Sequence, residues 1–300
     1  MKQAVRHYAP VAGLLAGIVA VSALLTLFTG SVGRQKERLQ VMTTVAPLRA
    51  AAMAVIGDVD EVELTHLSGS GSGCLHDYQL SPADRLALQQ ADLLLLNGAG
   101  AEAFLADLLP TLSATTVDTS AGLTLLCGDH HDHEGHHHEE SVNEHVWTSP
   151  TYYAHQVERV TAALCELDPA HAATYTANGK AYAARVRDVG ERLRQAVAKL
   201  PTTTCVTFHS SLIYFAQDIG LTPAATLQIG EDAGISAADL SAAQQVLATQ
   251  PQALLLYDSQ YPLRYEALTG AAVVLDTAVT DSDWLAAMEE NVRKLTEAGL

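Results

Sequence analysis

Residues 168–197 read DPAHAATYTANGKAYAARVRDVGERLRQAV, and this stretch decides the fold. Its Asp-Pro start favours a first helical turn, and its apolar residues recur three, four and seven positions apart, as on one face of a helix. These residues are Tyr175, Tyr182, Val186, Val189, Leu193 and Val197. At ~1.5 Å per residue the helix extends roughly 45 Å, longer than most helices within a domain. We expect a rigid helix that joins two lobes.

Strand-like and helical segments alternate on both sides of this helix. Before it we predict strands at 41–45, 61–67, 92–96 and 115–118, and helices at 47–56, 82–90, 101–109 and 149–166. After it we predict strands at 204–208, 224–228, 253–257 and 272–275, and helices at 211–219, 236–249 and 283–298. Such alternation forms parallel sheets with both faces covered. The predicted class is α/β, two lobes that each hold a parallel sheet flanked by helices, although we find no repeat that aligns residue by residue.

The order of these segments divides the chain into four predicted parts. They are a signal peptide or membrane anchor at 1–39, a first lobe at 40–150, linking helices at 151–200 and a second lobe at 201–300. Val11–Phe28 is a run of 18 uncharged residues that follows Lys2 and Arg6. Such a run is typical of a secretory signal or a transmembrane anchor, and its length favours an uncleaved anchor. We expect the rest of the chain outside the cytoplasm, tethered by this segment or secreted after its cleavage.

The composition excludes one class of partner. Hydrophobic residues make up 48% of the chain, which allows a sizeable core. Against 17 basic residues stand 34 acidic ones, which gives a net charge of −17. Because phosphate repels so acidic a chain, we expect no nucleic-acid partner.

Histidine is abundant and unevenly placed. Six of the 13 histidines lie in the tract DHHDHEGHHHEE at 129–140. So polar a tract cannot form a core, and we predict a loop. Its histidines are accessory ligands that bind metal weakly, unless the loop is merely solvated and its metal affinity adventitious. They are His130, His131, His133, His136, His137 and His138.

Three other histidines, His76, His145 and His209, lie after predicted strands or just before a helix. Ligands of open α/β sheets bind beyond the carboxyl ends of strands. Two of these histidines belong to the first lobe and one to the second, so they predict a metal site in the cleft between the lobes. Asp276, which ends another strand, is either a fourth ligand or a local cap. Three imidazoles and a carboxylate suit tetrahedral Zn²⁺.

Two short motifs match sequence patterns that are found in enzymes. His133-Glu134-Gly135-His136-His137 matches the HExxH pattern of zinc proteases, but glycine and the polar run oppose the helix that this mechanism needs. Gly98–Ala103 reads GAGAEA after a predicted strand, with Asp118 20 residues beyond Gly98, and imitates a dinucleotide fingerprint. A tight turn explains that isolated match. We predict no enzyme and no catalytic residue.

The four cysteines allow up to two disulfides in an oxidising compartment, and three pairings remain open. Cys74 and Cys127 both belong to the first lobe, so we favour a bridge between them.

Six short motifs run in order through residues 40–300 and together resemble the zinc and manganese substrate-binding proteins of ABC transporters. They are His76-Asp77-Tyr78 with Leu80 and Pro82, Ala91-Asp92-Leu93 with Gly98 and Glu102-Ala103-Phe104, His145-Val146-Trp147 with Ser149-Pro150, Phe208-His209 with Tyr214-Phe215 and Gly220-Leu221, Tyr257-Asp258-Ser259-Gln260-Tyr261, and Leu275-Asp276. An acidic, histidine-rich loop before the third motif is similar to the zinc-binding members.

The resemblance implies a receptor that captures a divalent metal outside the cell and hands it to a permease and ATPase on other chains. It strengthens His76, His145 and His209 as ligands and leaves Asp276 open. A histidine at 209, together with the tract, favours Zn²⁺ over Mn²⁺. We expect a monomer. The alternative on the same fold is a zinc-dependent adhesin or a surface protein that scavenges metal.

Overall fold

The computed structural model describes residues 38–67, 78–127, 142–227, 235–260, 268–278 and 283–299. Residues 39–300 form one compact unit. Within the described residues, no helix is both long and apolar enough to cross a membrane. The predicted anchor Val11–Phe28 lies outside them.

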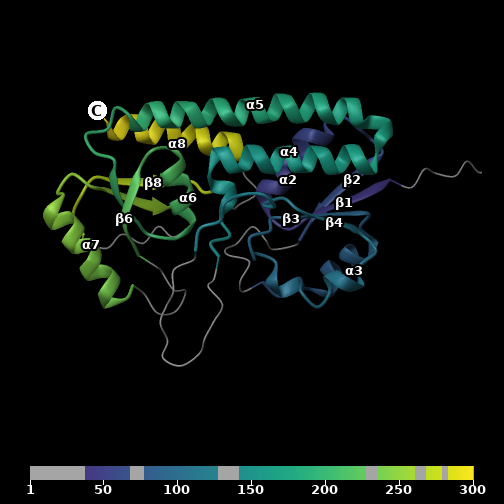
Figure 1. Cartoon of the computed structure of the whole chain (residues 1–300), viewed down its shortest axis with the longest axis horizontal. Helices are drawn as coiled ribbons and strands as arrows, with labels where there is room; N and C mark the ends of the chain where they lie inside the picture. Colours follow the sequence, from purple (N-terminus) through teal and green to yellow (C-terminus); the bar gives the residue numbers. More distant parts are fainter. Residues whose placement is uncertain are drawn as a thin grey trace, which may run out of the picture. The chain divides into compact units, whose positions relative to one another are not determined.

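Two sheets with the same strand order form the framework (Figure 1). The first holds β1 (Leu39–Thr43), β2 (Val62–His66), β3 (Leu93–Leu96) and β4 (Thr115–Asp118), in the order β2-β1-β3-β4. The second holds β5 (Thr204–Thr207), β6 (Thr222–Thr226), β7 (Leu254–Asp258) and β8 (Ala272–Leu275), in the order β6-β5-β7-β8. All neighbouring strands run parallel, so the predicted fold class is confirmed.

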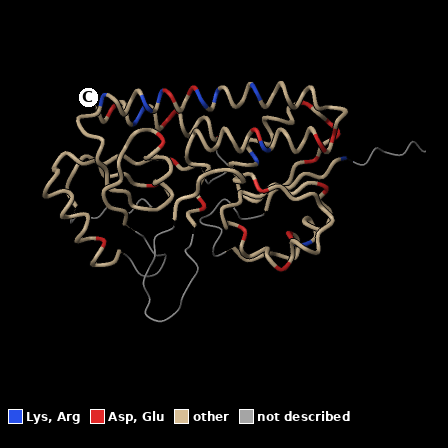
Figure 2. The backbone as a smooth tube through the Cα atoms, in the orientation of Figure 1, with Lys and Arg blue, Asp and Glu red and all other residues tan. Residues whose placement is uncertain are grey.

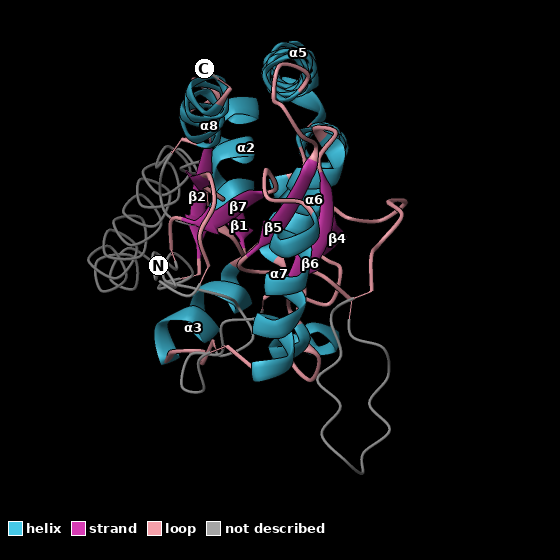
Figure 3. Ribbon diagram, turned by 90° about the vertical axis from the view of Figure 1, so that its left-hand side faces the viewer, coloured by secondary structure: helices cyan, strands magenta, loops and turns pink. Residues whose placement is uncertain are grey.

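Seven α-helices are found in the described residues. They are α2 (Ala46–Ile56), α3 (Pro82–Gln90), α4 (Pro150–Leu167), α5 (Ala172–Val197), α6 (Ser211–Asp218), α7 (Ala237–Thr249) and α8 (Trp284–Ala298). Short 3-10 turns occupy Ala103–Leu105, Leu109–Thr111, Val146–Thr148 and Pro169–His171. Helix α5 packs against α2, α4 and α8, and Figure 3 shows α2, α5 and α8 on one side of the strands.

The long linking helix is confirmed. Helix α5 has 26 residues, and the six apolar positions of its predicted stripe are buried. They belong to one hydrophobic core that also takes residues from β1, α2, α4, β5, β7 and α8. Gly179 allows α5 to approach α4 closely, because a Cβ atom there would lie 2.0 Å from Oγ1 of Thr161. The helix therefore packs into a core that both sheets share.

The predicted helix at 101–109 is wrong, since the chain forms two short 3-10 turns here, Ala103–Leu105 and Leu109–Thr111. Proline at 110 supplies no backbone N–H and disfavours helical geometry at the residue before it. The side chain of Glu102 also turns back to bind the N–H groups of Asn97 and Gly98, which draws the chain into a tight loop.

The charge of the molecule is unevenly distributed. Of the described basic residues, a majority lie on α5 and α8 (Figure 2). These are Lys180, Arg185, Arg187, Arg192 and Arg194 on α5, and Arg293 and Lys294 on α8. Several are paired with glutamates on the same helices, which limits their local field.

Candidate metal centre

Two of the predicted ligands, His145 and His209, lie against each other. His145 directly precedes the turn Val146–Thr148, and His209 lies two residues after β5. Their ring centroids are 5.2 Å apart with the rings nearly perpendicular, and the residues are only 4% and 7% exposed. Two imidazoles bound to one tetrahedral zinc, with Zn–N bonds of ~2.0–2.1 Å, have centroids about 5 Å apart. The observed separation therefore suits two ligands of a single ion.

Asn143 determines which nitrogen of His145 carries the proton and which keeps the lone pair that a metal would need. Its Nδ2 donates to the carbonyl of Ser210 at 2.9 Å, and its Oδ1 accepts the backbone N–H of His145 at 3.1 Å. These two partners fix the orientation of the amide. Nδ1 of His145 lies 2.9 Å from the same Oδ1, so it must carry the proton and donate it. The lone pair is thereby left on Nε2, the arrangement found in metal-binding histidines.

Sequence reasoning missed Asn143. The carboxylate of the neighbouring Glu144 faces the other ring nitrogen, since its Oε1 lies 3.6 Å from Nε2 of His145. The signal that identifies the true acceptor is the spacing Asn-x-His, since asparagine side chains readily bind the backbone two residues on.

The backbone of this loop is held by a chain of buried amides. Nδ2 of Asn97, at the end of β3, donates to the carbonyl of Glu144 at 2.9 Å. Nε2 of Gln156, on α4, donates to Oδ1 of Asn97 at 3.1 Å and to Oγ1 of Thr119 at 2.9 Å. The loop that carries His145 is therefore attached to the ends of β3 and β4 and to α4.

Glu102 supports the loop of His145 indirectly, because it holds the backbone of Asn97, whose side chain binds that loop. Its carboxylate accepts the N–H groups of Asn97 at 2.7 Å and Gly98 at 3.0 Å, and the hydroxyl of Thr44 at 2.5 Å. Burial raises its pKa to about 7, although these hydrogen bonds oppose the rise. Gly98 has φ +79°, and a Cβ atom there would lie 1.8 Å from Oδ1 of Asp118, so only glycine fits.

His209 has the opposite tautomer. The backbone N–H of Ser211 points at its Nδ1 over 3.1 Å, so a neutral ring carries its proton on Nε2. Binding a metal through Nε2 requires that proton to move to Nδ1 and this hydrogen bond to break. The hydroxyl of Ser211 donates to buried Asp258 at 2.7 Å, and burial raises the pKa of Asp258 despite this bond.

Asp276 acts as a local cap in this structure. Its Oδ1 accepts the N–H of Ala278 at 2.8 Å, and its backbone N–H donates to Oδ1 of Asn291 at 2.9 Å. The carbonyl of the neighbouring Thr277 accepts Nε1 of Trp147 at 3.0 Å, which ties the segment that carries Asp276 to the turn after His145. Within the described part of the chain, no group of three or more histidine, cysteine or acidic residues is arranged to hold a metal. Asp276 as a ligand thus stays a prediction.

Several predicted residues lie outside the described part of the chain. These are His76, the accessory histidines of the tract 129–140, and Cys74. The bridge between Cys74 and Cys127 therefore stays a prediction, whereas Cys165 and Cys205 are free thiols. His155 and His171 have structural roles, since His155 contacts the carbonyl of Ala121 at 3.0 Å and His171 contacts Asp168 at 2.7 Å.

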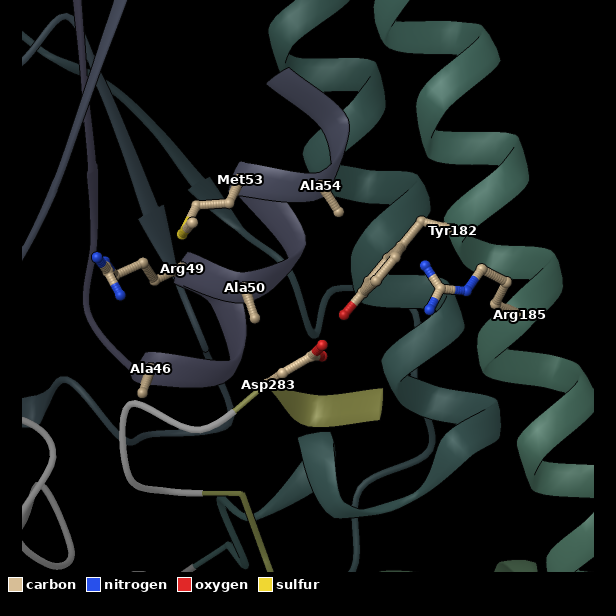
Figure 4. Close-up of a pocket in the computed structure, with 8 residues that line it drawn as sticks. All are labelled: Ala46, Arg49, Ala50, Met53, Ala54, Tyr182, Arg185 and Asp283. Atoms are coloured by element: carbon tan, nitrogen blue, oxygen red, sulfur yellow. The ribbon is translucent and has the colours of Figure 1, made fainter. Parts of the chain in front are cut away.

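A cavity of about 400 Å³ lies away from the histidine pair, between α2, α5 and the start of α8 (Figure 4). It is lined by Ala46, Arg49, Ala50, Met53, Ala54, Tyr182, Arg185 and Asp283. Two guanidiniums and a single carboxylate do not suit a metal cation, so the histidine pair is the better candidate site.

Two lobes of equal strand order, joined by one long helix and meeting at a pair of buried imidazoles, define the class of two-lobed substrate-binding receptors. The family of the periplasmic component A of the zinc-uptake complex, ZnuA, matches residues 41–298, and the chain belongs to this family.

Individual relatives differ in the metal named for them. The iron-binding protein YfeA of Yersinia pestis is 31% identical over 215 residues, which are 70% of this chain and 67% of YfeA. The zinc-binding lipoprotein AdcA of Streptococcus pneumoniae is 31% identical over 234 residues, which are 74% of this chain but only 46% of AdcA. A crystal structure of ZnuA superposes with a TM-score of 0.71 at 23% identity, covering 88% of this chain and all of the other. That last likeness shows the fold.

Proposed function

We propose that the chain is an extracytoplasmic receptor that captures Zn²⁺ and delivers it to the permease of an ABC-type importer. The observation that carries the proposal is the pair His145 and His209, which come from the two lobes and lie 5.2 Å apart. Membership of the zinc-uptake family and the name of AdcA support zinc as the cargo. The chain is then a binding protein without catalytic residues, and its partners are a permease and an ATPase.

The proposed ligands are His76, His145 and His209, with Asp276 or water in the fourth position. Imidazole nitrogen suits the borderline character of Zn²⁺ better than that of Mn²⁺, which prefers oxygen. Only neutral imidazole binds, so affinity falls as the pH drops through the ordinary histidine pKa near ~6.5. The proposed role of the tract 129–140 is to hold further metal weakly close to the tight site.

Calorimetric titration of residues 39–300 with Zn²⁺ and Mn²⁺, with and without residues 129–140, tests the proposal. We expect one tight zinc site that survives the deletion, weaker zinc sites that disappear with it, and weak manganese binding. His145→Ala in the deleted form is the matched control, and we expect it to weaken the tight site by at least about tenfold. A tight site that disappears with the tract, or none at all, would contradict the proposal.

A further inference from the structure

Every polar group of Asn143 has a partner, and these partners lie on both lobes. The residue is only 2% exposed. On the first lobe, its N–H donates to the carbonyl of Leu126 at 3.0 Å, and its Oδ1 accepts from His145. On the second lobe, its Nδ2 donates to the carbonyl of Ser210, and its own carbonyl accepts the hydroxyl of Tyr214 at 3.0 Å. One buried amide thus joins the residue after His209 to the ring of His145.

Tyr214 extends this connection. It lies on α6, is 4% exposed, and its hydroxyl accepts the backbone N–H of Leu126 at 2.8 Å while it donates to Asn143. The backbone N–H of Asn143 also donates to the carbonyl of Leu126, so a single hydroxyl from the second lobe binds two first-lobe segments that are themselves hydrogen-bonded to each other.

Through these contacts, the tautomer of His145 depends on whether the two lobes touch. The amide of Asn143 presents its oxygen to His145 because its nitrogen is committed to Ser210. If the lobes separate, the contacts with Ser210 and Tyr214 are lost, and the amide is free to rotate. Nδ1 of His145 then loses its fixed acceptor, and such acceptors typically contribute ~10–100-fold to metal affinity.

We propose that Asn143 and Tyr214 form an inter-lobe latch that presets Nε2 of His145 as a metal ligand and makes the lifetime of bound metal depend on contact between the lobes. Both are positioning residues, because they act through His145. The inference rests on the proposed function and deepens it: the latch supplies a way to release the cargo, since opening the lobes weakens a ligand as well as exposing the ion.

Zinc dissociation from the full chain into excess chelator, followed by stopped flow, tests the latch. Tyr214→Phe removes one hydroxyl and keeps the ring, and we expect dissociation roughly three- to tenfold faster, the scale of one lost hydrogen bond. Asn143→Ala removes the acceptor as well, and we expect at least about tenfold. The matched control is Tyr152→Phe, because the hydroxyl of Tyr152 donates to the carbonyl of Thr124, a first-lobe residue, and its ring packs against Tyr214 with centroids 5.5 Å apart, a ring contact that both Phe variants keep. Its rate is expected to equal that of the wild type.

The absorption bands of bound Co²⁺ supply a readout that a general loss of stability would not move. We expect altered bands in Asn143→Ala, because the ring of His145 is no longer oriented, and wild-type bands in Tyr214→Phe. If Asn143→Ala fails to fold, Tyr214→Phe decides alone. If the wild type binds zinc tightly but zinc dissociates from Tyr214→Phe no faster than from Tyr152→Phe, the latch is overturned and the receptor function is not. Absence of tight binding by the wild type would overturn both.

Discussion

The placement of single protons decides how well the histidine pair can hold a metal. His145 has its lone pair on Nε2 through Asn143, whereas His209 has its Nδ1 occupied by the N–H of Ser211. Loading a metal therefore requires a change at His209 but none at His145. The two ligands are expected to contribute differently to the rate of binding, although both contribute to affinity.

Replacing either histidine by alanine is expected to lower zinc affinity by at least about tenfold, because one ligand of the ion is lost. The matched control is His155→Ala, since the ring of His155 contacts the carbonyl of Ala121 and is not part of the pair. Competition with a fluorescent chelator measures the affinity. Unchanged affinity in both His145→Ala and His209→Ala would show that the ion binds elsewhere.

The two histidines could be singled out from sequence, because His209 follows a strand and His145 stands just before a helix, positions that the order of the elements reveals. The spacing Asn-x-His points to Asn143 as a partner of His145, but the inter-lobe contact of Asn143 and the role of Glu102 have no such local signal. Their roles depend on groups far along the chain, such as Ser210 and Thr44, which only the folded backbone brings near.

Among the helices, the start of α4 is fixed by a residue from another element. Asp218, at the end of α6, accepts the hydroxyl of Ser149 at 2.7 Å, the N–H of Thr151 at 2.8 Å and the guanidinium of Arg194 at 2.6 Å. Burial by itself would raise the pKa of Asp218, but these hydrogen bonds outweigh it and lower the pKa. The carboxylate therefore joins α4, α5 and α6 close to the segments that carry His145 and His209.

Asp218→Asn is expected to lower the free energy of unfolding at pH 7 by roughly 2–3 kcal/mol, because hydrogen bonds to a charged group are lost. A lowered folded-state pKa means that this contribution is present above the unfolded pKa of about 4 and is lost as the pH falls through the lower folded value. Urea unfolding of the metal-free protein should show the same difference between wild type and variant at pH 7 and pH 5, and a smaller one below about pH 4.

Glu158→Gln is the control, because its partner Arg187 and Glu158 itself are both more than half exposed. Exposed ion pairs contribute little, so this variant should unfold like the wild type at every pH. A difference for Asp218→Asn that is no larger than that of Glu158→Gln would contradict the role of Asp218.

The elements themselves were largely predictable, because hydrophobic periodicity and helix-start residues are local signals. Ser81, Ser149, Ser236 and Asp283 each cap the helix predicted after them. The failure at 101–109 arose where a side chain, Glu102, competes for backbone N–H groups, which composition does not reveal. The equal strand order of the two sheets also lacks a sequence signal, because different side chains can fill equivalent core positions.

The whole compact unit shares one principal core. The same cluster of buried residues takes Val41 and Leu93 from the first sheet, Leu193 from α5, and Leu254 and Leu275 from the second sheet. Stacking of Trp284 on Tyr153, with ring centroids 4.2 Å apart, joins α8 to α4 across this core. Because neither lobe has a separate core of this size, exposing one lobe removes packing partners of the other.

We therefore expect residues 39–300 to unfold in one cooperative thermal transition, with the calorimetric enthalpy equal to the van't Hoff enthalpy. Zinc at 1,000 times its dissociation constant should raise the free energy of unfolding by about 4 kcal/mol, because it binds only the folded state. The midpoint temperature of the whole transition should rise accordingly. His209→Ala should reduce that gain in free energy by at least about 1.4 kcal/mol at the same zinc concentration, the equivalent of a tenfold loss of affinity, although the residue contributes to one lobe alone. Scanning calorimetry with and without zinc gives both results. Two resolved transitions, of which zinc moves one, would mean that the lobes fold independently and that α5 is a spacer and not part of a common core.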